Sequence, residues 1–419
     1  MSDIIEKDES PGSSSSAVAT SVEVPTTAAI PQKRTARDLL RGDLGFIPVL
    51  VTLIVIMAFF TIASGGIFLK PENLSNLVLQ IATIGIIGLG EILVLLLGEI
   101  DLSVAAVSVF CSVVMAVLSE RVGVPGVVAI LAALLVGALV GFINGFFIAY
   151  LRVPSFIVTL AASIFYSGLL LNLLNGQSTL IIRDPFIVGI AGTPVSFLPN
   201  ILGIGLPILG VLLYALSVSL NFMRRRKAGL RTVSLTQLIL QIVLAFVIVL
   251  GAVTLFQSYQ GVPYATAILV ALIVLFWIIL TKTPFGRHVY AVGGNNEAAR
   301  RAGINVVGIR IAVFTLCSTL AAVGGIVQAS RGLAVASQID PVLLLNAIAA
   351  AVIGGVSLFG GRGSLWAIVL GGLIIGSLVN GLALLNQGTD VAQMVEGAVL
   401  LLAVTVDAVA RRLQARSGR

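Results

Sequence analysis

Apolar runs of 18 or more residues recur along the whole length of this 419-residue chain. A helix of that length crosses about 30 Å of hydrocarbon. Only 10% of the residues are charged, whereas a soluble domain carries about 25%. The 44 glycines allow helices in such a chain to approach one another closely. We therefore predict an all-α polytopic membrane protein.

The runs predict about 10–12 transmembrane helices, two of them interrupted. The proposed spans lie near 46–64, 74–97, 101–119, 125–149, 155–174, 198–219, 235–256, 264–281, 309–329, 342–359, 365–386 and 391–409. Four basic residues between 33 and 41 precede the first run, which predicts a cytoplasmic N-terminus. Alternation then leaves all but four of the 25 Lys and Arg residues inside, with Lys70, Arg121, Arg183 and Arg331 outside. The topology thus accounts for the net charge of +7, and nucleic acid is not needed as a partner.

The two ends of the chain differ in composition from the apolar middle. Residues 1–35 are rich in Ser, Thr, Pro and acidic side chains, which is typical of a disordered segment and not of a signal peptide. We therefore predict a disordered cytoplasmic tail over 1–40, a transmembrane domain over 41–410 and a second cytoplasmic tail over 411–419.

Two polar, glycine-rich stretches interrupt long apolar segments. They are Gly88–Ser103, with the sequence Gly-Glu-Ile-Asp-Leu-Ser at its end, and Gly354–Ser364. Interrupted hydrophobic segments in both halves of a chain point to a transport path. Tight cytoplasmic turns between hairpin helices explain them equally well, and the sequence leaves both interpretations open.

Polar side chains inside the apolar runs have two possible roles as well. Glu99 and Asp101 flank Ile100, and Asp101 either caps the next helix or lies at the inner mouth of a pathway. Asn and Glu residues within apolar runs either line a polar path or hold helices together by hydrogen bonds. Such residues are Glu91, Asn144, Asn172, Asn346, Asn380 and Glu396. As pathway candidates we take Glu99, Asp101, Ser103, Asn346 and Asn380.

The segment Thr281–Asn305 is a polar island between two apolar runs. Its stretch Asn296–Ala302 contains good helix formers, begins with a capping residue and is followed by Gly303, which predicts a short surface helix. The alternative is a solvated loop that follows the positive-inside rule. A membrane protein that gathers its polar residues in one loop offers that loop to a soluble partner.

Other motifs are missing from the chain. None of the five lysines follows a glycine, so the Gly-Lys step of a phosphate-binding loop does not occur. The single histidine, His288, and two distant cysteines, Cys111 and Cys317, provide no metal spacing or catalytic set. We predict no enzyme activity, no cofactor and no metal site.

Four strings then carry a family resemblance: residues 98–103, 283–306, 347–363 and 379–385. They resemble the permease subunits of bacterial monosaccharide ABC importers, the ribose/xylose/branched-chain amino acid permease family. The hairpin at 198–256, with its basic Arg224–Lys227 turn, is similar to the xylose branch.

The resemblance implies the ABC importer permease fold in the bacterial plasma membrane, with both termini cytoplasmic. It further implies a permease homodimer, a separate ATPase subunit and an extracytoplasmic sugar-binding protein. The segment 281–308 then corresponds to the loop that couples to the ATPase, with the candidates Gly286, Arg287, Tyr290, Gly293, Gly294, Asn295, Glu297, Ala298, Arg300, Gly303 and Ile304. An ion-coupled secondary transporter that uses Glu91, Glu99 and Asp101 is the alternative function.

Overall fold

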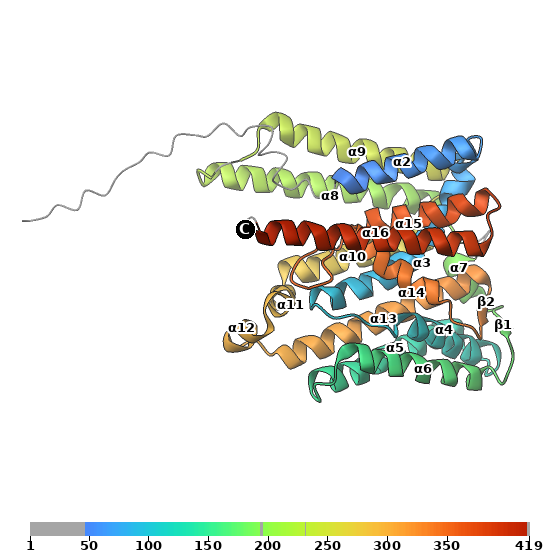
Figure 1. Cartoon of the computed structure of the whole chain (residues 1–419). Helices are drawn as coiled ribbons and strands as arrows, with labels where there is room; N and C mark the ends of the chain where they lie inside the picture. The colour runs from blue at the N-terminus through green and yellow to red at the C-terminus, as the bar shows by residue number, and fades with distance from the viewer. Residues whose placement is uncertain (1–46, 193–195, 231, 417–419) are drawn as a thin grey trace, which may run out of the picture. The chain divides into compact units, whose positions relative to one another are not determined.

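The structure, a computed structural model, describes residues 47–192, 196–230 and 232–416. The predicted tail over 1–40 lies outside this range. Each of the twelve predicted spans contains a helix (Figure 1). These helices are α2 (Ile47–Ala63), α3 (Pro71–Leu96), α4 (Val104–Glu120), α5 (Gly126–Ala149), α6 (Ser155–Leu173), α8 (Asn200–Lys227), α9 (Leu235–Gln257), α10 (Tyr264–Lys282), α13 (Val306–Gly332), α14 (Pro341–Ile353), α15 (Ala367–Leu384) and α16 (Thr389–Arg416).

Length and composition divide these helices into two groups. In the described part of the chain, eight are long and apolar enough to cross a membrane: α3, α5, α6, α8, α9, α10, α13 and α15. Most of α2, together with α4 and α14, forms shorter apolar helices. The helical membrane fold predicted from the sequence is thus confirmed, and α16 continues to Arg416, beyond the predicted span 391–409.

Several short elements were not predicted. They are the 3₁₀ helix η2 (Ile67–Leu69), the helices α7 (Pro185–Ala191) and α11 (Pro284–Gly294), and the strands β1 (Thr179–Ile181) and β2 (Ala334–Ala336). The two strands pair antiparallel, with Leu180 opposite Val335. They lie at the end of the helix bundle opposite to α11 and α12 (Asn296–Arg301), as Figure 1 shows.

The segments predicted as outer loops gather at the β1–β2 end. Arg121 donates hydrogen bonds to the carbonyl of Leu173 and to the side chain of Gln177. Nearby, the Glu120 carboxylate accepts hydrogen bonds from the backbone N–H groups of Arg183 and Asp184. The loops after α4 and α6 therefore meet at one end of the bundle, as the predicted alternation of spans requires.

The two predicted interruptions explain why α4 and α14 are short. The stretch 97–103 before α4 and the stretch 354–366 after α14 are not α-helical. Asp101 donates its backbone N–H to Glu91, so residues 97–101 run back along the last turns of α3 and α4 begins inside the bundle. A Cβ at Gly354 would overlap the backbone of Ala367, so the end of α14 lies directly against the start of α15. The stretch 97–103 thus folds back into the bundle, whereas the stretch 354–366 is partly exposed, with Phe359 and Trp366 among its exposed side chains.

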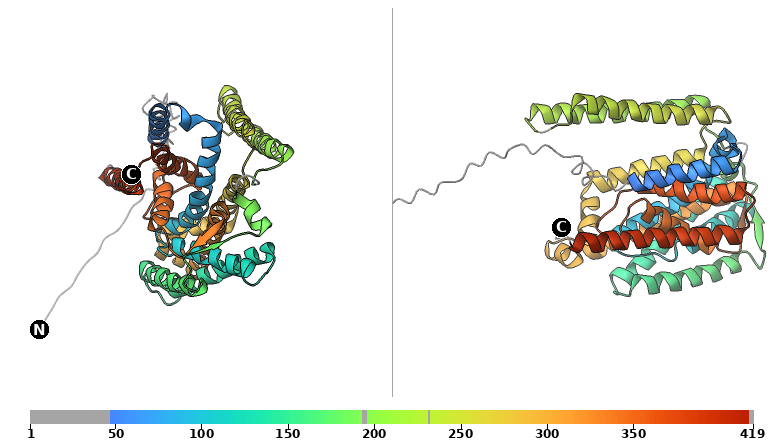
Figure 2. Two further views of the ribbon diagram at one scale, coloured as in Figure 1. Left: turned by 90° about the vertical axis from the view of Figure 1, so that its right-hand side faces the viewer. Right: turned by 45° about the horizontal axis from the view of Figure 1, so that its top comes forward.

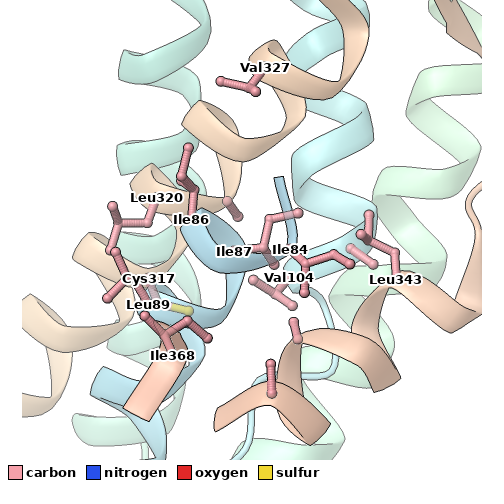
Figure 3. Close-up of a cluster of buried hydrophobic side chains, with 14 of the residues drawn as sticks. Ile84, Ile86, Ile87, Leu89, Val104, Cys317, Leu320, Val327, Leu343 and Ile368 are labelled. Atoms are coloured by element: carbon pink, nitrogen blue, oxygen red, sulfur yellow. The ribbon is translucent and has the colours of Figure 1, made fainter. Parts of the chain in front are cut away.

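α3 lies at the centre of the bundle. Of the eight long apolar helices it is the most buried, because 89% of the residues in its most apolar 18-residue stretch are buried. α13 packs closely along it, because a Cβ at Gly324 would overlap the side chain of Ile87. Figure 3 shows Ile84, Ile87 and Val104 together, with Leu343 of α14 beside them.

The hairpin of α8 and α9 contributes little to this interior. Only Gly203 and Val211 of α8 and Leu238 and Val253 of α9 are buried among their described residues. Figure 2 shows the hairpin standing beside the other helices of the bundle. Most of its remaining apolar side chains are exposed, as expected for helices that lipid surrounds.

Candidate functional site

Two short helices form the predicted coupling segment. Pro284 occupies the first turn of α11, where its missing N–H costs nothing. Asn295 then caps α12, since its side chain accepts a 2.9 Å hydrogen bond from the N–H of Ala298. Gly303, with φ of 84°, follows the end of α12. A short surface helix is present where the sequence predicted it, but its cap is Asn295 and not the predicted Asn296.

α11 packs against the bundle through one face. Gly286 lies so close to the carbonyl of Leu280 that a Cβ there would overlap it. Val289 and Val292 are buried on the same helix. The Tyr290 hydroxyl donates a 2.9 Å hydrogen bond to the carbonyl of Gly363, and burial raises the pKa of this phenol. α11 is therefore tied to the loop between α14 and α15.

Close backbone contacts continue at the end of α11. A Cβ at Gly293 would overlap the carbonyl oxygen of Leu96, the last residue of α3. A Cβ at Gly360 would lie 2.8 Å from both the Gly293 carbonyl oxygen and the Gly98 nitrogen. We call Gly98, Gly293, Gly360 and Gly361, with the Leu96 carbonyl, the glycine junction. It joins the coupling segment to both interrupted stretches, which the sequence did not predict.

Left-handed backbone conformations explain part of this glycine requirement. Gly98 has φ of 79° and Gly361 has φ of 70°, values that side chains with a Cβ rarely adopt. Gly361 also donates its N–H to Leu96 over 2.9 Å. At these two positions, conformation and close packing both favour glycine.

α12 presents a charged surface. Glu297 accepts hydrogen bonds from Arg300 at 2.6 Å and Arg301 at 3.1 Å. A cavity of about 480 Å³ is lined by Glu297 and Arg300 together with Arg152 and Arg310. A second, of about 410 Å³, is lined by His288, Gly303 and Ile304, among others. α12 and its flanking residues thus present polar groups and hollows on the surface, and Arg287, Gly294 and Ala298 are exposed nearby.

Glu99 lies in an ion pair. Arg310, near the start of α13, donates from Nε to Glu99 over 2.6 Å. The two side chains are only 21% and 12% exposed, respectively. Burial raises the pKa of the Glu99 carboxyl, while the Arg310 guanidinium opposes this shift. Glu99 therefore balances a buried charge beside the coupling segment.

Asp101 and Ser103 belong to a different, fully buried cluster. One Asp101 oxygen accepts hydrogen bonds from the Ser103 N–H, at 2.8 Å, and from the Ser103 hydroxyl. Asn144 of α5 donates to the Ser103 hydroxyl over 3.2 Å. Glu91 completes the cluster by accepting the Asp101 N–H over 3.2 Å. This arrangement joins α3, α4 and α5 near the C-terminal end of α3.

The other two pathway candidates lie elsewhere. Asn380 of α15 accepts a 2.8 Å hydrogen bond from Asn73 at the start of α3, about 27 Å along the helix from Glu91 at 1.5 Å per residue. Asn346 lies on α14, and it is buried. The structure therefore brings Asp101 and Ser103 together, but the five candidates do not form one site.

Comparison with known proteins gives a family match over residues 73–404, to a family described as the branched-chain amino acid transport system / permease component. The xylose transport system permease protein XylH of Haemophilus influenzae is 38% identical over 360 residues, covering 85% of this chain and 94% of that protein. XylH of Escherichia coli K12 is 37% identical, with coverages of 87% and 91%. The fructose import permease FrcC of Rhizobium meliloti is 30% identical, with 88% and 86%. No solved structure matches the chain.

Proposed function

This chain belongs to the family of branched-chain amino acid transport system permease components, and we propose that within this family it forms the membrane pathway of a monosaccharide importer, with xylose as the first candidate substrate. As a permease component of an ABC transporter it is not itself catalytic, and a separate subunit hydrolyses ATP. The observation that carries the proposed substrate is the 38% identity to a xylose permease, which extends over 85% of this chain.

The proposed orientation has both termini and the coupling segment in the cytoplasm. The charge distribution supports it, because the Arg224–Lys227 cluster at the end of α8 then lies inside. The ATPase subunit docks on α12, and a sugar-binding protein docks at the β1–β2 end. Two copies of the permease form the pathway.

The glycine junction supports a specific route for the coupling. Movement of the ATPase displaces α12 and, with it, α11. Gly293 lies directly on the Leu96 carbonyl, and Gly361 is hydrogen-bonded to the same oxygen. A displacement of α11 therefore reaches the end of α3 and the loop before α15 through backbone contacts. These elements flank the interrupted stretches at which the pathway opens and closes.

Reconstitution tests this proposal. Proteoliposomes are prepared with the chain and its ATPase, and the sugar-binding protein is added on the opposite side of the membrane from the ATPase. They are expected to take up radiolabelled D-xylose only when ATP is present on the side of the ATPase. Uptake of D-ribose and D-fructose is measured in parallel, because other relatives are named as ribose and fructose import permeases. Accumulation of none of the three would contradict the sugar proposal. Uptake that an uncoupler abolishes at constant ATP would instead support the ion-coupled alternative.

A further inference from the structure

The end of α8 concentrates positive charge on the surface. Arg224, Arg225, Arg226 and Lys227 are its last four residues, and all four are exposed. We call them the basic collar. At 100° per residue they cover about 300° around the helix axis, so they surround the end of α8 on nearly every side. The collar lies at the same end of the bundle as α12 (Figure 1, Figure 2).

No acidic side chain balances the basic collar. From position 185 to position 296 the sequence contains neither Asp nor Glu. Among the described residues the collar makes no ion pair, whereas Arg300 and Arg301 both pair with Glu297. The dipole at the C-terminus of α8 supplies only about half a negative charge against four cations. The collar therefore carries an excess of positive charge that an anion from outside the chain can neutralise.

The length of α8 places the collar at the depth of lipid headgroups. As a helix, the apolar stretch 201–220 covers about 30 Å, which is the thickness of the hydrocarbon core. Arg224 follows four residues later and thus lies about 6 Å beyond the hydrocarbon. The polar layer on each side of the core is about 5–8 Å thick. The collar therefore begins at the level of the lipid phosphates.

The two helix ends that flank the turn are closed by their own hydrogen bonds. Leu230 donates its N–H to the Arg225 carbonyl over 3.0 Å, and Gly229 has a φ of 67°, which ends α8. At the start of α9, Ser234 and Gln237 form a capping box. Because that box occupies backbone amides of α9, the attraction for an anion comes from the side chains of the collar.

Exposed apolar side chains accompany the collar. Leu230, Val233 and Leu235 are 60%, 47% and 58% exposed. Basic side chains beside exposed apolar ones are typical of a surface that lies in the headgroup region of a bilayer. A water-filled docking site for an acidic protein or a nucleic acid does not require these apolar groups. The combination favours a lipid as the occupant.

We propose that the basic collar binds phospholipids with an anionic headgroup. The guanidinium groups contact the lipid phosphates, while Leu230, Val233 and Leu235 meet the upper part of the acyl chains. The bound lipids anchor the α8–α9 hairpin, which has few buried residues of its own. In the proposed orientation they belong to the cytoplasmic leaflet. The assignment does not depend on which substrate the chain transports.

Fluorescence quenching tests the assignment in the full chain without the ATPase. Ala228→Cys, at an exposed position beside the collar, carries a fluorophore, while Cys111 and Cys317 are buried and stay unlabelled. The protein is reconstituted into bilayers with phosphatidylglycerol or phosphatidylcholine that is spin-labelled close to the headgroup. Phosphatidylglycerol is expected to bind beside the fluorophore about tenfold more tightly than phosphatidylcholine. About 0.5 M NaCl should reduce this preference by screening the charges.

Three sets of substitutions separate the charge of the collar from other effects. Replacing Arg224, Arg225 and Arg226 together by Gln should lower the preference for phosphatidylglycerol at least about fivefold. Replacing the same three by Lys keeps the charge, so the preference should stay within about twofold of wild type. Arg183→Gln removes an exposed arginine from the loop before α7 and should leave the preference unchanged. Equal affinity of the wild type for both lipids, or a triple Gln variant with the wild-type preference, would overturn the assignment.

A protein partner is the competing occupant of the collar. If the collar met an acidic surface of the ATPase instead, the triple Gln variant would lose the ATPase during copurification and would keep the wild-type lipid preference, which overturns the lipid site. The lipid assay requires no transport. A wild type that prefers phosphatidylglycerol but imports none of the three sugars would contradict the proposed function and support the lipid site.

Discussion

The backbone N–H of Gly361 donates a hydrogen bond to the carbonyl oxygen of Leu96 over 2.9 Å. The bond joins the loop before α15 to the last residue of α3. Gly293 of α11 lies on the same carbonyl, so close that a Cβ would overlap it. Three segments far apart in the sequence therefore converge on one oxygen atom, and substitutions there should affect coupling more than membrane insertion.

Gly293→Ala is expected to lower ATP-driven sugar uptake at least about tenfold, because the new methyl group must push α11 away from Leu96. Gly294→Ala is the matched control: a Cβ on Gly294 meets nothing within 4 Å. Uptake in proteoliposomes and the amount of inserted protein are the measurements. Equal uptake by the two variants would remove the close contact at Gly293 from the coupling route.

Glu297→Arg is expected to uncouple the ATPase while insertion and folding persist. The substitution replaces the partner of Arg300 and Arg301 with a third cation at the start of α12, where the helix dipole favours an acid. These pairs are exposed, so the loss of stability should stay below about 1 kcal/mol. Sugar uptake should fall although the ATPase still hydrolyses ATP. Wild-type uptake by Glu297→Arg would contradict the role of α12.

Substitutions of Glu99 and Arg310 are expected to have non-additive effects on the stability of the protein. Arg310→Met leaves the nearly buried Glu99 carboxylate without its counter-charge and should destabilise the protein by about 3 kcal/mol. Adding Glu99→Gln removes that unpaired charge and should restore part of the loss. Thermal unfolding in detergent measures both. If the double variant is less stable than Arg310→Met alone, the pair does not act as a unit.

Sidedness gives a prediction that does not require transport. Arg300→Cys, on the exposed face of α12, should react with impermeant thiol reagents only from the cytoplasmic side. Arg183→Cys, in the exposed loop before α7, should react only from outside. Inside-out and right-side-out vesicles provide the two compartments. Modification of Arg300→Cys from the outside would reverse the proposed orientation and separate α12 from any cytoplasmic ATPase.

The sequence predicted the spanning helices well because each consists of a long apolar run. It predicted α12 from its helix formers and from Gly303 after its end, although the cap is Asn295 and not the predicted Asn296. α11 was missed for a physical reason. Gly286, Gly293 and Gly294 are poor helix formers in isolation, but the first two are needed where backbones touch. Tertiary packing therefore favours a helix that intrinsic propensity does not.

The pathway candidates show a second limit. Asp101 and Ser103 are neighbours in sequence, so their hydrogen bond was within reach of local reasoning. Asn380 and Asn73 meet across 307 positions, and no local pattern reveals such a partner.

The α8–α9 hairpin buries only four of its described residues, Gly203, Val211, Leu238 and Val253. A segment that shares so little of the interior can be shortened or exchanged without disturbing the helices around α3. The turn between α8 and α9 is accordingly the natural place to insert a fluorophore or affinity tag. A probe fixed there would report on the protein in its membrane without touching the predicted coupling segment.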